Sequence, residues 1–175
     1  STPGFFFMCG IVALIGSREA APQLLEGLRQ LEYRGYDSSG IATVDAEGQL
    51  TCLRASGKLV NLTARVEAEG ARGCCGIGHT RWATHGKPEE RNAHPHRSGD
   101  GAVAAVQNGI IENHRNLREE LESAGVQFRS ETDTEVIPHL VAAELEHLQA
   151  SGGKAAGTLL LMAVQEHAYY GSFGY

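Results

Sequence analysis

The first residue with the chemistry of a nucleophile is Cys9, which stands at the mouth of the apolar run Val12–Ile15. Gly10 follows it and leaves room for another backbone or a ligand beside the thiol. Met8 precedes it and resembles a start residue whose removal would expose the α-amine of Cys9. An α-amine has a pKa of about 7.7–8.0 and can serve as the base for the thiol of its own residue. A core-filling thiol is the alternative interpretation of a single cysteine.

Other polar groups with complementary chemistry also fall at expected element ends. Arg34 and Asp37 flank a turn, Asn108 and Gly109 follow an apolar strand, and Asp133 precedes a helix. Taken singly, each has a structural explanation, namely an ion pair, a hairpin turn and a helix start. Together with the thiol they supply a nucleophile, an amide donor, a guanidinium for a carboxylate and an acid for an ammonium. This combination suits acyl transfer from an amino-acid amide.

The stretch Thr80–Asp100 has no hydrophobic periodicity and is too long to be a simple connection. Long irregular segments in compact domains are usually functional or disordered. This one contains Trp82 and the pair His94–Pro95–His96, which a solvated, disordered loop is not expected to hold. We therefore expect an ordered binding loop.

Hydrophobic periodicity and turn residues predict the elements that position these groups. Strands are expected at Val12–Ile15, Ile41–Val44, Leu50–Leu53, Cys74–His79 and Ala102–Val106. Helices are expected from Pro22 toward Gly35, over Leu59–Glu69, before Gly125, and after the capping-box sequence Thr132–Glu135.

Composition bounds the class of protein. A chain of 175 residues forms one domain with a real core. The formal net charge of -6 argues against binding to nucleic acid or an anionic membrane. No apolar run approaches the roughly 20 residues that span a bilayer. The four cysteines include an adjacent pair and suggest no disulfide framework, so we expect a reducing, cytoplasmic setting.

A metal site is the third interpretation, beside an enzyme and a binding module. Its candidate ligands are Cys74, Cys75, His79, His85, His94 and His96. Structural zinc sites favour pairs of ligands separated by two to four residues, and adjacent cysteines fit that spacing poorly. We therefore expect neither a metal nor another cofactor.

Six motifs together resemble the class II glutamine amidotransferases. They lie in order between Met8 and Leu148, at residues 9–12, 31–38, 79–86, 92–96, 108–113 and 130–137. Within that class they are most similar to the glutaminase half of the glucosamine-6-phosphate synthase (glutamine–fructose-6-phosphate aminotransferase) family. The phosphoribosyl-pyrophosphate amidotransferases share the cysteine start but read differently at Tyr33–Tyr36 and Arg81–Thr84, so they rank second.

The resemblance implies an α+β fold, the N-terminal-nucleophile (Ntn) hydrolase four-layer αββα sandwich of two antiparallel sheets. It divides the chain into an N-terminal extension, residues 1–7, and a glutaminase domain, residues 8–175. This domain is expected to be truncated at its C-terminus, and the sugar-phosphate isomerase half is absent.

The resemblance also implies catalytic roles for three residues. Cys9 would attack the side-chain amide of L-glutamine, aided by its own α-amine, to give L-glutamate and ammonia. Asn108 and Gly109 would form the oxyanion hole. In the full-length enzyme the ammonia would aminate fructose 6-phosphate. The alternative is an inactive glutamine-binding fragment, because the extension blocks the α-amine.

A second group of residues is implied to bind the substrate. Arg81 would hold the α-carboxylate of glutamine with its bidentate fork, and Asp133 would hold the α-ammonium. Thr84 and His85 would line the pocket, and Trp82 would belong to the loop that closes it. Arg34 would order the loop beside the nucleophile, and His94 would support the residues that contact the substrate.

Overall fold

The computed structural model describes residues 9–83 and 87–152, and the backbone of 160–165. Its strands are β1 (Gly10–Ile15), β2 (Ser38–Val44), β3 (Leu50–Ser56), β4 (Cys75–Arg81), β5 (His96–Arg97), β6 (Val103–Asn108) and β7 (Leu160–Gln165). Its α-helices are α1 (Ala20–Gln30), α2 (Leu59–Glu69), α3 (His114–Ser123) and α4 (Val136–Ala150). Short 3-10 turns lie at Glu32–Arg34 and Glu90–Asn92. The predicted strands and helices are thus confirmed, with shifts of a few residues at their ends.

The first sheet is antiparallel throughout and has the order β1-β4-β2-β3. β4 lies inside it, so its residues are flanked on both sides by hydrogen-bonded strands. The register places Gly10 of β1 opposite Thr80 of β4. The start of β1, where Cys9 stands, therefore adjoins the end of β4.

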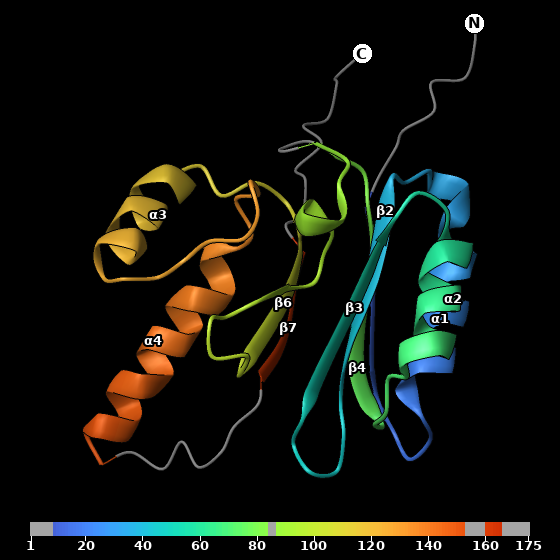
Figure 1. The fold of residues 1–175 in the computed structure, drawn as a ribbon, viewed down its shortest axis with the longest axis horizontal. Coiled ribbons are helices and arrows are strands. Elements are labelled where there is room, and N and C mark those ends of the chain that lie inside the picture. Colours follow the sequence, from blue (N-terminus) through green and yellow to red (C-terminus); the bar gives the residue numbers. More distant parts are fainter. Residues whose placement is uncertain (1–8, 84–86, 153–159, 166–175) are drawn as a thin grey trace, which may run out of the picture.

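Successive residues of this sheet face two different layers, because side chains alternate along a strand. Ile41 joins the core formed with the leucines of α1 and α2, whereas its neighbour Ala42 packs on Val106 of β6. Figure 1 shows α1 and α2 over one face of the first sheet, the second sheet against the other face, and α4 beyond it. This is the predicted four-layer arrangement.

The second sheet has the order β5-β6-β7 and differs in one respect from the predicted antiparallel sheets. β5 and β6 are antiparallel, but β6 and β7 run parallel. A parallel pair requires a long crossover connection. The segment between β6 and β7 contains α3 and α4, which are enough to carry the chain back to the same end of the sheet.

The expected capping box at Thr132–Glu135 is wrong. α4 begins at Val136, and the structure shows no side-chain hydrogen bond that caps it. Glu135 instead accepts hydrogen bonds from the backbone N–H groups of Arg129 and Ser130, upstream of the helix. Pro138 lies within the first turn of α4, where a proline is tolerated. Among the described residues, none of the helices combines the length and apolar character needed to cross a bilayer.

Candidate active site

Cys9 is held beside the end of β4 by backbone groups. The N–H of Trp82 donates to its Sγ at 3.2 Å, and the thiol lies 3.7 Å from the carbonyl oxygen of Trp82. The N–H of Gly10 donates to Oγ1 of Thr80 at 3.1 Å. A Cβ on Gly10 would meet Leu31 and Thr80, so this glycine makes room for side chains, not for the expected backbone or ligand. Burial raises the pKa of the Cys9 thiol, so the thiol is protonated near neutral pH.

Arg81 ends β4 and points its guanidinium into the same region. Its side chain is buried, and Nη1 lies 3.9 Å from Oδ1 of Asp37. The backbones of the two residues are also joined, because the N–H of Asp37 donates to the carbonyl of Arg81 at 2.8 Å. Cys9, Asp37 and Asp133 all act electrostatically on Arg81. The guanidinium of Arg81 is therefore close enough to Cys9, Asp37 and Asp133 to interact with their charges.

Asn108 is the last residue of β6 and reaches the backbone of Cys9 from the second sheet. Its Nδ2 donates to the backbone carbonyl of Cys9 at 3.1 Å. Its Oδ1 lies 2.8 Å from Nε2 of His79. Gly109 follows directly at an exposed position where the chain leaves the sheet. The structure thus brings the predicted nucleophile and the predicted amide donor together across 99 residues of sequence.

Asp133 is buried and fixed in the loop before α4. Its Oδ2 accepts a hydrogen bond from the N–H of Ile111 at 2.8 Å, which ties this loop to the segment after β6. Glu135 holds the same loop from behind through Arg129 and Ser130. Burial raises the pKa of Glu135, but hydrogen bonds from Ser130 and from the N–H of Arg129 outweigh this effect and hold the pKa below the usual range. The carboxylate of Asp133 therefore has a fixed position beside the start of α3.

Three buried histidines, His79, His94 and His96, pack ring against ring in a tilted and an edge-on pair. The ring centroids of His79 and His94 lie 4.3 Å apart, and those of His94 and His96 lie 4.7 Å apart. Burial lowers the pKa of His79 to about 4 and lowers the pKa of His94 and His96 as well. All three rings are therefore neutral near pH 7. Within the described part of the chain, no group of three or more His, Cys, Asp or Glu side chains is arranged to hold a metal ion.

The other predicted site residues are placed less closely. Trp82 contacts Cys9 through its backbone, and the residue as a whole is 39% exposed. His94 supports β6, because its Nδ1 accepts a hydrogen bond from the N–H of Gln107 at 3.4 Å. The guanidinium of Arg34 donates to the hydroxyl of its neighbour Tyr33 at 3.3 Å. Thr84 and His85 lie outside the described residues.

His79 and Asp37 also contact the site, although the sequence predicts only a candidate metal ligand for the first and a turn ion pair for the second. His79 anchors Asn108, and Asp37 accepts a hydrogen bond from the N–H of Ala83, next to Trp82. Their signal was present, since both belong to motifs that carried the resemblance. Their partners lie far along the chain, so spacing alone gave them no role.

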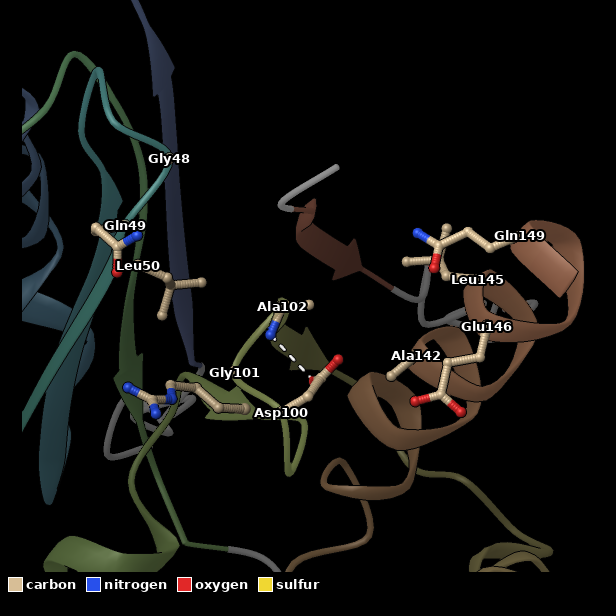
Figure 2. Close-up of a pocket in the computed structure, with 11 residues that line it drawn as sticks. Gly48, Gln49, Leu50, Asp100, Gly101, Ala102, Ala142, Leu145, Glu146 and Gln149 are labelled. Atoms are coloured by element: carbon tan, nitrogen blue, oxygen red, sulfur yellow. Dashed lines mark hydrogen bonds between the residues drawn. The ribbon is translucent and has the colours of Figure 1, made fainter. Parts of the chain in front are cut away.

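A cavity of about 450 Å³ lies away from this chemistry. Figure 2 shows it between the β2–β3 hairpin, the turn Asp100–Ala102 and α4. The carboxylate of Asp100 accepts a hydrogen bond from the N–H of Ala102 and thus closes this turn. The residues that line the cavity include none of the predicted site residues.

Paired sheets between helical layers, with a cysteine at the start of β1 facing an amide donor, are the plan of the Ntn amidotransferases. A family model described as "Glutamine amidotransferase domain" matches residues 79–168, just over half of the chain. The chain therefore belongs to the glutamine amidotransferase domain family.

Individual relatives agree with this family. A glutamine–fructose-6-phosphate aminotransferase [isomerizing] of Thermosynechococcus vestitus is 57% identical over 168 residues, which are 95% of this chain and 26% of that protein. The protein of the same name from Escherichia coli is 54% identical over 165 residues, or 94% of this chain and 26% of that protein. The chain thus spans about a quarter of the length of these relatives.

Among solved structures, the glutamine phosphoribosylpyrophosphate amidotransferase of B. subtilis, complexed with ADP and GMP, is similar to this chain. The TM-score is 0.59 at 29% sequence identity, over 75% of this chain and 29% of that one. This likeness supports the Ntn fold derived above.

Proposed function

We propose that this domain hydrolyses the side-chain amide of L-glutamine to L-glutamate and ammonia, with Cys9 as the nucleophile. The observation that carries the proposal is the hydrogen bond from Nδ2 of Asn108, at the end of β6, to the backbone carbonyl oxygen of Cys9, at the start of β1. It places an amide donor on the same residue that carries the thiol, and acyl transfer requires a nucleophile and a hydrogen-bond donor side by side.

The reaction proceeds in two stages. Sγ of Cys9 gives its proton to the α-amine and attacks the amide carbon of the glutamine side chain. The α-amine passes this proton to the amide nitrogen, the carbon–nitrogen bond breaks, and ammonia leaves a thioester on Sγ. Water then hydrolyses the thioester, releasing glutamate and restoring the thiol. The side-chain amide of Asn108 and the backbone N–H of Gly109 stabilise the oxyanion in both stages.

The thiol needs a base, because burial raises its pKa. The described hydrogen bonds of Sγ are to the backbone of Trp82, which accepts no proton at neutral pH. The α-amine of Cys9, with a pKa of about 7.7–8.0, is suited to the task once residues 1–8 are removed. In the 175-residue chain the same nitrogen is an amide and is not basic.

Arg81 and Asp133 bind the two charged groups of the substrate. The buried guanidinium of Arg81 takes the α-carboxylate, and Asp133 takes the α-ammonium. Opposite charges at fixed positions select an α-amino acid over a simple amide. Five further residues complete the pocket in this proposal: Thr84 and His85 at its wall, Trp82 in its closing loop, and Arg34 and His94 as supports.

The wider role follows from the names of the relatives. We infer that the ammonia aminates fructose 6-phosphate, and that the partner is a sugar-phosphate isomerase domain of the same protein. The high identity to two aminotransferases of this name supports this inference over that of a phosphoribosyl-pyrophosphate amidotransferase.

The test compares two N-terminal forms, the 175-residue chain and a chain that begins at Cys9, each confirmed by intact mass. Glutamate release from L-glutamine is measured for both and for Cys9→Ala in the shorter form. We expect turnover from the form that begins at Cys9 and about 10²–10⁴-fold less from the longer form, because it lacks the base. Cys9→Ala is expected to abolish turnover while retaining glutamine binding.

Two outcomes count against the proposal. Retained turnover in Cys9→Ala removes Cys9 as the nucleophile. Equal rates from the two forms, with the extension shown to be still attached, remove the α-amine as the base. Cys74→Ser serves as the matched control, since Cys74 is exposed and lies outside the site.

A further inference from the structure

His79 lies on the inner face of β4 and contacts the end of β6. Its Nε2 is 3.1 Å from the carbonyl oxygen of Gln107 and 2.8 Å from Oδ1 of Asn108. The ring is fully buried and lies against that of His94. His79 therefore meets the predicted oxyanion donor on the side away from the nucleophile.

The partners of His79 fix its tautomer. A backbone carbonyl only accepts hydrogen bonds, so Nε2 must carry the hydrogen that faces Gln107. The ring is neutral near pH 7, because burial lowers its pKa to about 4. Nδ1 is consequently bare, and among the described residues it is buried without a hydrogen-bond partner. The ring thus presents one hydrogen, at Nε2, to two acceptors.

The tautomer of His79 in turn fixes the orientation of the Asn108 amide. Oδ1 of Asn108 accepts from Nε2, and Nδ2 then faces Cys9, whose carbonyl oxygen is 3.1 Å away. The opposite orientation would set an NH₂ group against the Nε2–H of the ring. An amide nitrogen carries two hydrogens, and the bond to Cys9 uses one of them.

We propose that His79 is a positioning residue that keeps the Nδ2 group of Asn108 turned toward the carbonyl oxygen of the reacting glutamine amide. This proposal rests on the proposed function, in which Asn108 supplies an oxyanion donor. Without the hydrogen bond from His79, the amide of Asn108 can turn over and present Oδ1 to the developing negative charge. A donor would then be replaced by a repelling lone pair.

The packing of His79 against His94, and of both residues against Gln107, holds the ring of His79 in place. His94 accepts a hydrogen bond from the N–H of Gln107, while His79 donates to the carbonyl of the same residue. The side chain of Gln107 accepts a further hydrogen bond from Thr134 at 3.0 Å. The backbone that carries Asn108 is therefore fixed, and the remaining freedom of Asn108 is the rotation of its own side chain.

Two isosteric variants separate the two nitrogens of the ring. The amide nitrogen of His79→Gln falls near the position of Nε2, whereas that of His79→Asn falls near Nδ1. In whichever N-terminal form hydrolyses glutamine, we expect His79→Asn to lower kcat about 10–100-fold with little change in KM. This is the loss typically found when a residue that orients a metal-binding side chain is mutated, and we use it as the closest analogue. We expect His79→Gln to retain most of the parental kcat.

A double-mutant cycle tests whether His79 acts through Asn108. Asn108→Ala is expected to lower kcat about 10²–10³-fold. Adding His79→Asn to it should then cause no further loss, because the group being oriented is already gone. Losses that multiply, or an unchanged kcat in His79→Asn, would overturn the proposal.

Nuclear magnetic resonance gives a readout that does not depend on turnover. In the parent chain the ¹⁵N shifts of His79 are expected to report a hydrogen on Nε2. The side-chain amide signals of Asn108 are expected to stay in place in His79→Gln. A hydrogen on Nδ1 would overturn the positioning role even if the enzyme is active. If neither N-terminal form hydrolyses glutamine, the proposed function fails, and these spectra still decide the orientation of Asn108.

Discussion

Arg81 and Asp133 are buried side chains of opposite charge, and separate parts of the backbone hold them. Arg81 is joined to Asp37 by a backbone hydrogen bond and a side-chain ion pair, while Asp133 accepts from the N–H of Ile111. Neither position depends on the other residue. In the proposed function, these two fixed charges form a frame that binds the two charged ends of an α-amino acid.

Arg81→Lys is the substitution that tests this frame at the level of a single residue. Lysine keeps the charge but loses the bidentate fork. Hydrogen bonds to charged groups contribute about 1.5–3 kcal/mol, so we expect the KM for glutamine to rise about 10–150-fold and kcat to change less. Steady-state kinetics measure both constants, and Arg29→Lys on the exposed face of α1 is the control. Effective competition by propionamide in the parent would contradict the frame.

At the level of elements, the first sheet and the loop that bears His94 meet at Gly40. A Cβ on this residue of β2 would overlap the carbonyl oxygen of His94 and crowd the side chain of Arg54. Only glycine allows the backbone of the loop to lie so close to the sheet. The contact fixes the segment that bears His94 against the layer that bears His79.

Gly40→Ala is therefore expected to destabilise the fold. Overpacking of this kind costs about 1–3 kcal/mol or more, which corresponds to a Tm lower by roughly 2–4 °C per kcal/mol. Thermal unfolding followed by circular dichroism measures it. Gly16→Ala is the matched control, since a Cβ at Gly16 meets no atom within 4 Å. Equal Tm values for the two variants would contradict this prediction, because they would show that the loop at His94 moves aside at no cost in stability.

The elements were predicted well where the signal was local. The spacing of the apolar residues predicts β2, β6 and α1. Cys9 and Asn108 stand out in the sequence because each lies next to an apolar run. The capping box at Thr132 failed because Glu135 bonds upstream, to Arg129 and Ser130. The layered arrangement came from the resemblance, since periodicity does not say which sheet faces which.

The roles of His79 and Asp37 illustrate what spacing cannot supply. Asn108 is 29 residues from His79, and Ala83 is 46 residues from Asp37. Both contacts arise only when the sheets pair in one register. A histidine on an apolar strand looks the same in sequence whether it fills space or orients an amide.

At the level of the whole molecule, the buried neutral histidines make stability depend on pH. In the unfolded chain a histidine titrates near pH 6.5, whereas burial lowers the native pKa of His79 to about 4 and lowers those of His94 and His96. Below pH 6.5 the unfolded state thus binds more protons than the native state. The sign of this difference means that stability rises with pH in this range.

We expect the free energy of unfolding to fall between pH 6.5 and pH 4, by up to roughly 1.4 kcal/mol per pH unit for each of these three histidines. Glu135 adds to the loss below about pH 4.5, because its native pKa is lowered. Urea unfolding at half-unit steps of pH measures the slope. The exposed His147→Asn should leave this slope unchanged. A flat profile over this range would mean that the histidines take up protons in the native state.

β4 carries its site residues in strict alternation. Ile77 faces the second sheet, His79 meets Asn108 on the same side, and Thr80 bonds to β1. A single residue inserted into β4 would exchange these faces for every position beyond it. Such an insertion would remove the hydrogen bond between His79 and the side-chain amide of Asn108. It would also move the guanidinium of Arg81 to the opposite face of the sheet. The turn at Asp45–Gly48, by contrast, stands outside the packed layers and can be lengthened. In a library of one-residue insertions, we therefore expect insertions at Asp45–Gly48 to preserve folding and insertions within β4 to abolish it.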